Sequence, residues 1–187
     1  MGKHRCSWCK GDSLYEAYHD EEWGVPVKND DLLFEFLVLE TFQAGLSWIT
    51  ILRRRENFRT AFDNFDYKKI SKYPEAKILD LLQDEGIIRN KLKVRATVSN
   101  AHAFMAIQIE FGTFSNYIWQ FVEGVSVKNK VLNYKEAPAN TTTSNAISKD
   151  LKKRGFKFVG STIIYAFMQA TGMVNDHEIE CFRYHEV

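Results

Sequence analysis

The stretch Glu75–Gly112, EAKILDLLQDEGIIRNKLKVRATVSNAHAFMAIQIEFG, decides the expected fold. Its second half has apolar residues three or four positions apart, in the run Val94, Val98, Ala101, Met105 and Ile109. That spacing is typical of an amphipathic helix. A shorter periodic run precedes Gly86, where we expect a tight turn. The stretch therefore predicts a helix, a turn at Gly86 and a second, longer helix.

Two more helices are expected upstream of this stretch. Asp30 or Asp31 can cap a helix that continues through LLFEFLVLETFQA and ends at Gly45. Ser47 can cap the next one, WITILRRRENFRTAF, whose apolar residues also recur at helical spacing. We expect these two helices to follow one another closely, because only a short turn separates them.

Downstream, residues 123–143 are polar, contain Pro138 and lack periodicity, so we expect a long surface connection between two closely packed lobes. Ser144 can cap a helix that Gly155 ends. An apolar helix should follow, from Ser161 or Thr162 to Gly172, and a last short one should start near Asn175 or Asp176. Strand signals are confined to residues 156–159. The expected class is all-α.

The amino-acid composition limits the classes of protein to which this chain can belong. The chain has 187 residues, 45% of them hydrophobic and 14% aromatic, which fits one globular domain over residues 1–187. A net charge of +1 means that any nucleic-acid binding must come from local clusters. The N-terminal MGKHRCSWCKGD has no apolar stretch, and the longest apolar run, Ile163–Met168, is too short to span a bilayer. We expect no membrane association and a reducing, cytoplasmic compartment.

Cysteines and histidines near both ends suggest a metal site. His177 and Cys181 are four residues apart, which on a helix places both side chains on one face. The N-terminal segment adds Cys6, Cys9 and His19, and His185 is a further candidate. A set of thiolates and imidazoles suits zinc better than magnesium or calcium. Spacing alone does not decide which four residues bind, and ordinary residues at these positions are the alternative.

Glu40 lies on the apolar stripe of its predicted helix, in line with Leu33, Phe36, Leu37 and Ala44. A buried carboxylate needs strong partners or a raised pKa, so such residues are candidates for chemistry. The alternative is an ion pair with an arginine from residues 53–55. Aromatic residues gather in the same part of the chain: Trp8, Tyr15, Tyr18, Trp23 and Trp48. An acid among aromatic rings would suit a flat cationic heterocycle, although simple core packing explains most aromatic residues.

The predicted helix–turn–helix at DEGIIRNK is similar to the hairpin with which helix–hairpin–helix proteins bind a DNA phosphate through turn amides and a helix N-terminus. Two basic clusters could add to a DNA surface, and solvated faces are the alternative. The first comprises Arg89, Lys91, Lys93 and Arg95, and the second comprises Lys152, Lys153, Arg154 and Lys157 with Phe156 and Phe158.

Taken together, these stretches resemble the 3-methyladenine DNA glycosylase I family over nearly the whole chain. The stretches are LYEAYHDEEWGVP, QAGLSWITILRRRENFR, GIIRNKLK, SKDLKKRGFKFVGSTIIY and ATGMVNDH, with Cys181 downstream. Several long stretches in the same order are far more specific than any single motif above.

The resemblance implies a helix–hairpin–helix fold and a monofunctional, lyase-free enzyme that removes 3-methyladenine from double-stranded alkylated DNA after base flipping. It places one structural Zn²⁺ on Cys6, His19, His177 and Cys181. It assigns the base pocket to Glu40, Tyr18 and Trp48, lined by Trp8 and Tyr15, with Glu40 the candidate catalytic residue. The candidate DNA contacts are Gly86, Ile88, Arg89 and Lys91. Apart from the resemblance, Leu46 is the candidate wedge into the base stack, because it lies in the turn between the first two predicted helices.

Asn90 and Leu92 depart from the basic residues or glycine usual in that family's hairpin. We expect a monomer. Two rivals stay open: a non-catalytic, zinc-stabilised DNA-binding module, and an all-α enzyme acting on free nucleosides.

Overall fold

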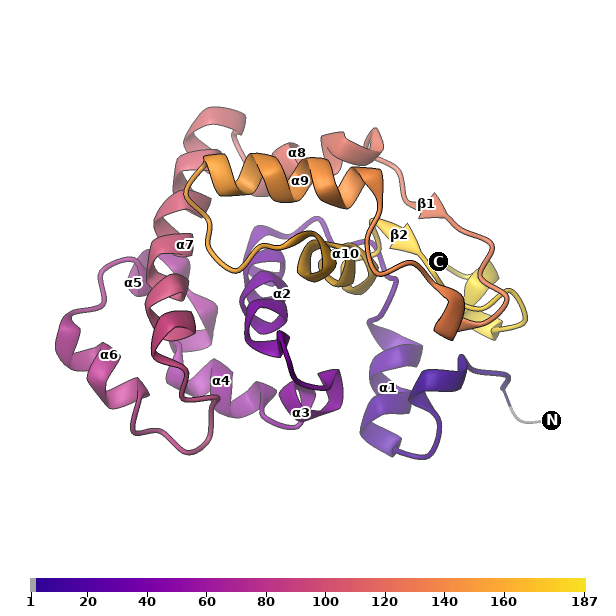
Figure 1. The fold of residues 1–187 in the computed structure, drawn as a ribbon, viewed down its shortest axis with the longest axis horizontal. Coiled ribbons are helices and arrows are strands. Elements are labelled where there is room, and N and C mark those ends of the chain that lie inside the picture. Colours follow the sequence, from indigo (N-terminus) through magenta and orange to yellow (C-terminus); the bar gives the residue numbers. More distant parts are fainter. Residues whose placement is uncertain (1–2) are drawn as a thin grey trace.

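The structure is a computed structural model in which residues 3–187 are described, so the first two residues of the predicted domain 1–187 lie outside the described range. It is mostly helical (Figure 1). The α-helices are α1 Ser13–Glu21, α2 Asp30–Gln43, α3 Trp48–Leu52, α4 Arg55–Ala61, α5 Tyr67–Ile70, α6 Glu75–Leu81, α7 Lys91–Phe111, α8 Phe114–Trp119, α9 Thr142–Lys153 and α10 Ser161–Ala170. The 3₁₀ turns are η1 Ser7–Cys9, η2 Asp63–Phe65, η3 Gln120–Val122, η4 Tyr134–Glu136 and η5 Phe182–His185.

Helix α2 is the centre of the molecule, with α7, α8, α10 and α3 packed around it (Figure 1). Every residue from Leu33 to Phe42 is buried, so this part of the helix has no solvent-exposed face. It is buried on all sides and not, as expected, along one apolar stripe. The helix begins after Asn29, whose side chain accepts the Leu32 N–H at 3.0 Å. The expected cap at Asp30 or Asp31 is therefore wrong by one or two residues.

The deciding stretch forms two helices, as predicted, but a longer connection than a tight turn joins them. Helix α6 ends at Leu81 and α7 begins at Lys91. Within the connection, the Gly86 N–H donates to Asp84 and the Gly86 carbonyl accepts from Asn57 on α4. Asn90 caps α7 by accepting the N–H groups of Leu92 and Lys93. The hairpin is thus held by side chains rather than by a two-residue turn.

The single helix predicted over residues 48–62 is wrong. The chain forms α3, breaks at Arg53 and Arg54, and resumes as α4. Ser47 is the N-cap of α3 as expected, but its hydroxyl pairs with the Thr50 hydroxyl.

The C-terminal part departs most from expectation. Strand β1 (Val127–Lys128) pairs in parallel with β2 (Val174–Asn175), and a bridge joins Val131 to Glu178. The expected helix from residue 175 is wrong, because β2, a turn and η5 occupy that segment. The segment 123–143 is likewise no simple surface connection, since this pairing fixes it to the C-terminal segment. Residues 156–159 form no strand.

Helix α9 begins at Thr142 rather than after Ser144, because Thr141 and Ser144 form a capping box. Helix α10 starts at Ser161, and Gly172 follows its end with a φ of 68°, both as expected. Among the described residues, no helix is both long and apolar enough to cross a membrane.

Candidate functional site

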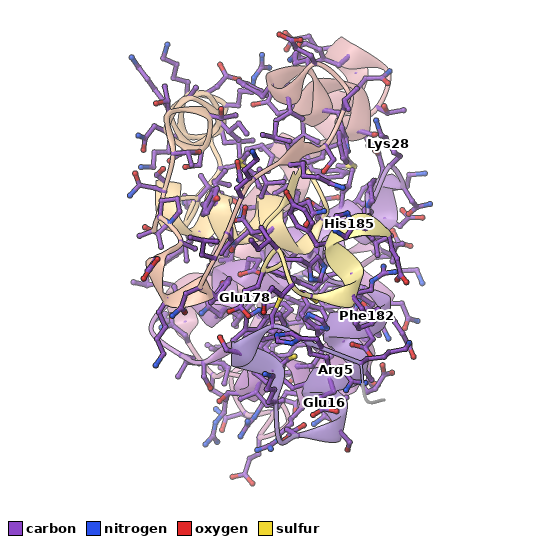
Figure 2. All side chains as sticks on the ribbon, turned by 90° about the vertical axis from the view of Figure 1, so that its right-hand side faces the viewer. Arg5, Glu16, Lys28, Glu178, Phe182 and His185 are labelled. Carbon is purple, nitrogen blue, oxygen red and sulfur yellow. The ribbon has the colours of Figure 1, made fainter. Side chains whose placement is uncertain are left out.

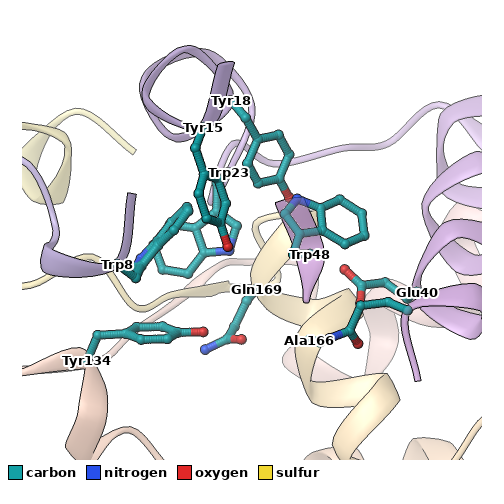
Figure 3. Close-up of a pocket in the computed structure, with 10 residues that line it drawn as sticks. Trp8, Tyr15, Tyr18, Trp23, Glu40, Trp48, Tyr134, Ala166 and Gln169 are labelled. Carbon is teal, nitrogen blue, oxygen red and sulfur yellow. The ribbon is translucent and has the colours of Figure 1, made fainter. Parts of the chain in front are cut away.

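The candidate site is a cavity between α1, α2, α3 and α10, closed on one side by η1 and η4 (Figure 3). Its empty volume, including the open mouth, is about 470 Å³, which is ample for one flat heterocycle. The lining residues are Trp8, Tyr15, Tyr18, Trp23, Glu40, Gln43, Trp48, Tyr134, Ala166 and Gln169. All five candidate pocket residues from the sequence therefore lie around one cavity.

Glu40 is the only carboxylic acid that lines this cavity among residues 3–187, and it is 3% exposed. Its carboxyl oxygens make no hydrogen bond or salt bridge to any described residue. The arginine partner considered for it goes instead to Glu35, one turn earlier on α2, which accepts from Arg55 at 2.6 Å and Arg59 at 2.7 Å. Complete burial raises the pKa of Glu40 to about 8. The cavity thus contains an acid with which no residue from 3 to 187 pairs.

This burial predicts a pH-dependent cost to stability. The pKa of Glu40 is about 8 in the folded protein, above its ordinary value of 4.5. The free energy of unfolding therefore receives its full contribution from protonated Glu40 below pH 4.5. That contribution is lost as the pH rises from 4.5 to 8. We expect Glu40→Gln to be the more stable protein at alkaline pH. From pH 5.5 to 8.5 the difference in free energy of unfolding between variant and wild type should widen by about 3 kcal/mol.

Urea unfolding of both proteins at several pH values measures this difference. Effects of pH on other groups are common to both proteins and cancel. A difference that stays constant with pH would show that Glu40 is solvated in the folded state.

Aromatic rings surround the acid. Trp48 lies 5.4 Å from Tyr18 between ring centroids, and on the other wall Trp8 lies 4.7 Å from Tyr15 and 5.0 Å from Trp23. Burial, with Glu40 as a further cause, raises the pKa of Tyr15 to about 12 and that of Tyr18 well above its ordinary value. Both phenols therefore remain protonated hydrogen-bond donors at neutral pH.

Two indole N–H groups at the cavity are also unsatisfied. The Nε1 atoms of Trp8 and Trp48 are buried without a hydrogen-bond partner in the described part of the chain. Because most buried donors in proteins are paired, these two are unusual. The site combines one unpaired carboxyl group, the hydroxyl donors of Tyr15 and Tyr18 and flat aromatic walls.

Sequence reasoning missed Tyr134 and Gln169, which both line the cavity (Figure 3). Tyr134 lies in the segment interpreted as a surface connection, and nothing in its local pattern indicates a buried role. Gln169 is different, because it is an amide that directly follows the apolar run Ile163–Met168 within one helix. The signal that selected Glu40 could have selected Gln169 as well.

Behind the cavity, four side chains from both ends of the chain converge. Cys6, His19, His177 and Cys181 are buried, and their ligand atoms all lie within 4.8 Å of one another. Cys6 Sγ and Cys181 Sγ are each 3.6 Å from His177 Nδ1, and His19 Nε2 is 3.4 Å from Cys181 Sγ and 3.2 Å from His177 Nδ1. A tetrahedral zinc ion would place such atoms about 3.3–3.8 Å apart, so the residues fit this ion.

The remaining ring nitrogens of both histidines have acceptors. His19 Nδ1 is 2.8 Å from Asp20, which Arg5 in turn holds at 2.8 Å, and His177 Nε2 is 3.0 Å from the Trp23 carbonyl. Such outer contacts fix the tautomer that leaves the other nitrogen free for a metal. Figure 2 shows Arg5, Glu178 and Phe182 on the face where this N-terminal segment meets the C-terminal one.

The other two candidates lie outside the cluster. Cys9 is buried, and its thiol donates to the Cys6 carbonyl at 3.3 Å. His185 is exposed. The Cys6 thiol beside Cys181 lowers the pKa of Cys181, and the same contact raises that of Cys6. A turn, rather than the expected helix, brings His177 beside Cys181.

The candidate DNA residues lie at the hairpin and at the turn after α2. Arg89 and Lys91 are exposed, Ile88 is half-buried, and Gly86 is half-buried beside Asn57. Leu46 is 37% exposed in the Gly45 turn. The two basic clusters are smaller than their sequences suggest. Lys93 is buried and donates to the carbonyls of Phe42 and Ala44, while Arg95 and Arg154 pair with acids.

Comparison with known proteins identifies the family. The profile of the methyladenine glycosylase family matches residues 8–184. DNA-3-methyladenine glycosylase 1 of Escherichia coli K12 is 47% identical over 180 residues, covering 96% of both chains. The crystal structure of a 3-methyladenine DNA glycosylase I superposes with a TM-score of 0.93 at 48% identity, covering 96% of this chain and 98% of the other.

A variant of 3-methyladenine DNA glycosylase I solved in complex with 3-methyladenine superposes with a TM-score of 0.92 at 31% identity, covering 95% and 96% of the two chains. These matches extend over nearly the full length of both partners. The chain belongs to the methyladenine glycosylase family.

Proposed function

We infer that this protein is a DNA-repair glycosylase that hydrolyses the glycosidic bond of 3-methyladenine in alkylated DNA. The observation that carries the inference is Glu40, a buried and unpartnered acid inside an aromatic cavity. Methylation at N3 gives adenine a positive charge while it is bonded to the sugar. A cavity with an unneutralised carboxyl group and aromatic faces favours that cation over ordinary neutral bases.

The same charge weakens the glycosidic bond, because the base leaves as a neutral molecule. Modest catalysis is then enough, and the main task is to select and extrude the damaged nucleotide. In our proposal Trp48 stacks on the purine, Glu40 accepts hydrogen bonds from its exocyclic amine and Tyr18 donates to its edge. Trp8 and Tyr15 form the opposite wall. Water attacks the sugar carbon, and no lysine forms a covalent intermediate.

We propose that the connection between α6 and α7 is a helix–hairpin–helix element that holds the DNA backbone. Its exposed Arg89 and Lys91 are free to meet phosphates near Gly86 and Ile88, since the only acid beside Arg89 among the described residues is the exposed Glu85. Leu46, exposed on a turn near the cavity, would fill the gap in the base stack. Lys93 has a structural role instead. Its ammonium group donates to the carbonyls of Phe42 and Ala44 at the end of α2, just before the turn that contains Leu46.

If the hairpin binds phosphates, Arg89→Ala and Lys91→Ala should each weaken binding of undamaged duplex DNA and lower the slope of log K against log salt by about one. The measurement is fluorescence anisotropy over a range of salt concentrations. Lys128→Ala is the matched control, because β1 lies at the opposite end of the molecule from the hairpin (Figure 1). An equal loss of DNA affinity in all three variants would mean that binding depends on the total charge of the protein, and it would contradict a phosphate site at the hairpin.

We propose that the cluster of Cys6, His19, His177 and Cys181 binds one zinc ion with a structural role. When bound, the ion cross-links the two ends of the chain, and four protein ligands leave no open position for water. The protein residues complete the site: Asp20 and the Trp23 carbonyl orient the two imidazoles, and the Glu178 N–H donates to Cys6 Sγ at 3.3 Å.

We also propose that the chain acts in the cytoplasm as a monomer on double-stranded DNA, as one domain of two packed helical lobes.

The decisive experiment is release of free 3-methyladenine from methylated duplex DNA. A non-catalytic zinc-stabilised module would release none, and an enzyme for free nucleosides would prefer the methylated nucleoside to the duplex. Either result would replace the proposed function.

A further inference from the structure

Asp176 lies next to Gln169 of the cavity wall and accepts three hydrogen bonds. It is 1% exposed, and its Oδ1 accepts from the Asn129 side chain at 2.6 Å. Its Oδ2 accepts from the Tyr165 hydroxyl at 2.6 Å and from Gln169 Nε2 at 2.8 Å. Of these three donors, Gln169 is the one that lines the base cavity.

The contact decides which way the Gln169 amide faces. Asp176 Oδ2 accepts from the nitrogen end of the amide, which leaves the oxygen end for the cavity. Figure 3 agrees, with the amide nitrogen on the Tyr134 side and the oxygen toward Glu40. No described residue donates to that oxygen. The reversed amide would place two acceptors against each other in a buried site.

We propose that Asp176 is a positioning residue that makes Gln169 a second hydrogen-bond acceptor beside Glu40, so that the cavity selects 3-methyladenine over 3-methylguanine. The inference rests on the proposed function. It adds the residues that set base specificity.

The chemistry of the two purines gives the reason. The exocyclic amine of adenine carries two N–H bonds, one for each acceptor. Guanine has a carbonyl oxygen at the same ring position, which brings only lone pairs toward Glu40 and Gln169. A site that is built to receive two N–H groups at the exocyclic position and meets none there leaves its buried polar atoms unpaired, and such mismatches discriminate strongly. Positive charge does not distinguish the two bases, because N3 methylation gives it to both.

The experiment measures both bases released from one methylated duplex by chromatography, as a ratio of initial rates. Wild type should favour 3-methyladenine. Gln169→Leu should lower that ratio by at least about tenfold, since it removes the acceptor at similar volume. Asp176→Asn should shift it in the same direction, because the Gln169 amide can then reverse. Tyr165→Phe is the matched control, which removes another donor from the same carboxylate oxygen and should keep the wild-type ratio.

Zinc content and thermal melting of each variant control for effects on the neighbouring His177. If a variant releases neither base, quenching of tryptophan fluorescence by free 3-methyladenine and free 3-methylguanine gives the corresponding ratio of affinities, and Gln169→Met supplies a second substitution. An unchanged ratio in Gln169→Leu, or an equal loss in Tyr165→Phe, overturns the inference and leaves the proposed function intact. A wild type that releases neither base overturns the proposed function itself.

Discussion

Glu40→Gln should lower kcat/KM for release of 3-methyladenine about 10²- to 10³-fold in a fully folded protein. The carboxylate and the cationic base would meet in a cavity from which water is excluded, where opposite charges interact far more strongly than in solution. Glutamine keeps the size and one acceptor but removes the charge. The loss should therefore be larger for the methylated, cationic base than for binding of undamaged DNA.

The pH dependence gives a second signature. With the pKa of Glu40 at about 8 in the free protein, kcat/KM of the wild type should rise with pH and level off above that value, while Glu40→Gln should show no such rise. Single-turnover assays on methylated DNA across pH 6–9 make the comparison.

Glu35→Gln is the matched control, because Glu35 is a second buried acid on the same helix whose charge Arg55 and Arg59 already neutralise. It should cost about 3–5 kcal/mol of stability and spare the chemistry of the folded protein. Wild-type rates in Glu40→Gln, or equal losses in the two variants, would remove Glu40 from the mechanism.

Cys181→Ala should lower the melting temperature by about 10–20 °C. Structural zinc sites contribute about 10 kcal/mol of folding free energy, and loss of one ligand removes a large part of it. For a chain of this size each kcal/mol corresponds to about 2–4 °C. The chemistry of whatever protein remains folded should change much less, because no ligand lines the base cavity.

Cys9→Ala is the control for this prediction. Cys9 is as deeply buried as Cys181 and lies beside the cluster without belonging to it. Calorimetric melting and elemental analysis of both variants, purified without chelators, separate metal binding from packing. Equal melting temperatures for the two variants, or wild type free of zinc, would contradict the structural zinc ion.

The helices could be predicted because their periodicity is a local property. Helices α2, α7 and α10 appear where apolar residues recur at helical spacing. What the sequence could not reveal depends on distant contacts. The break at Arg53 interrupts a continuous helical pattern, and the pairing of Val127 with Val174 overrides weak local preferences. The same pairing explains why Tyr134 was missed, since its role depends on residues more than forty positions away.

In the candidate pocket, too, some features follow from local sequence and others only from distant contacts. Burial of Glu40 follows from its place among apolar residues, but its lack of a partner does not, because Arg55 could have paired with either acid on α2. Only the folded structure shows that Arg55 pairs with Glu35. The four clustered metal candidates came from the family resemblance, and spacing alone left Cys9 and His185 open. The structure brings the four together and leaves the other two outside.

The base cavity and the cysteine–histidine cluster both draw on residues from opposite ends of the chain. Trp8 packs 5.4 Å from His19, and Trp23 packs 4.6 Å from His177, between ring centroids. During synthesis on the ribosome, α2 can pack early against α3, α7 and α8, whereas this corner must wait until Cys181 has left the exit tunnel. A nascent chain arrested before that point would carry Glu40 in an open half-site, with no enclosure for a base.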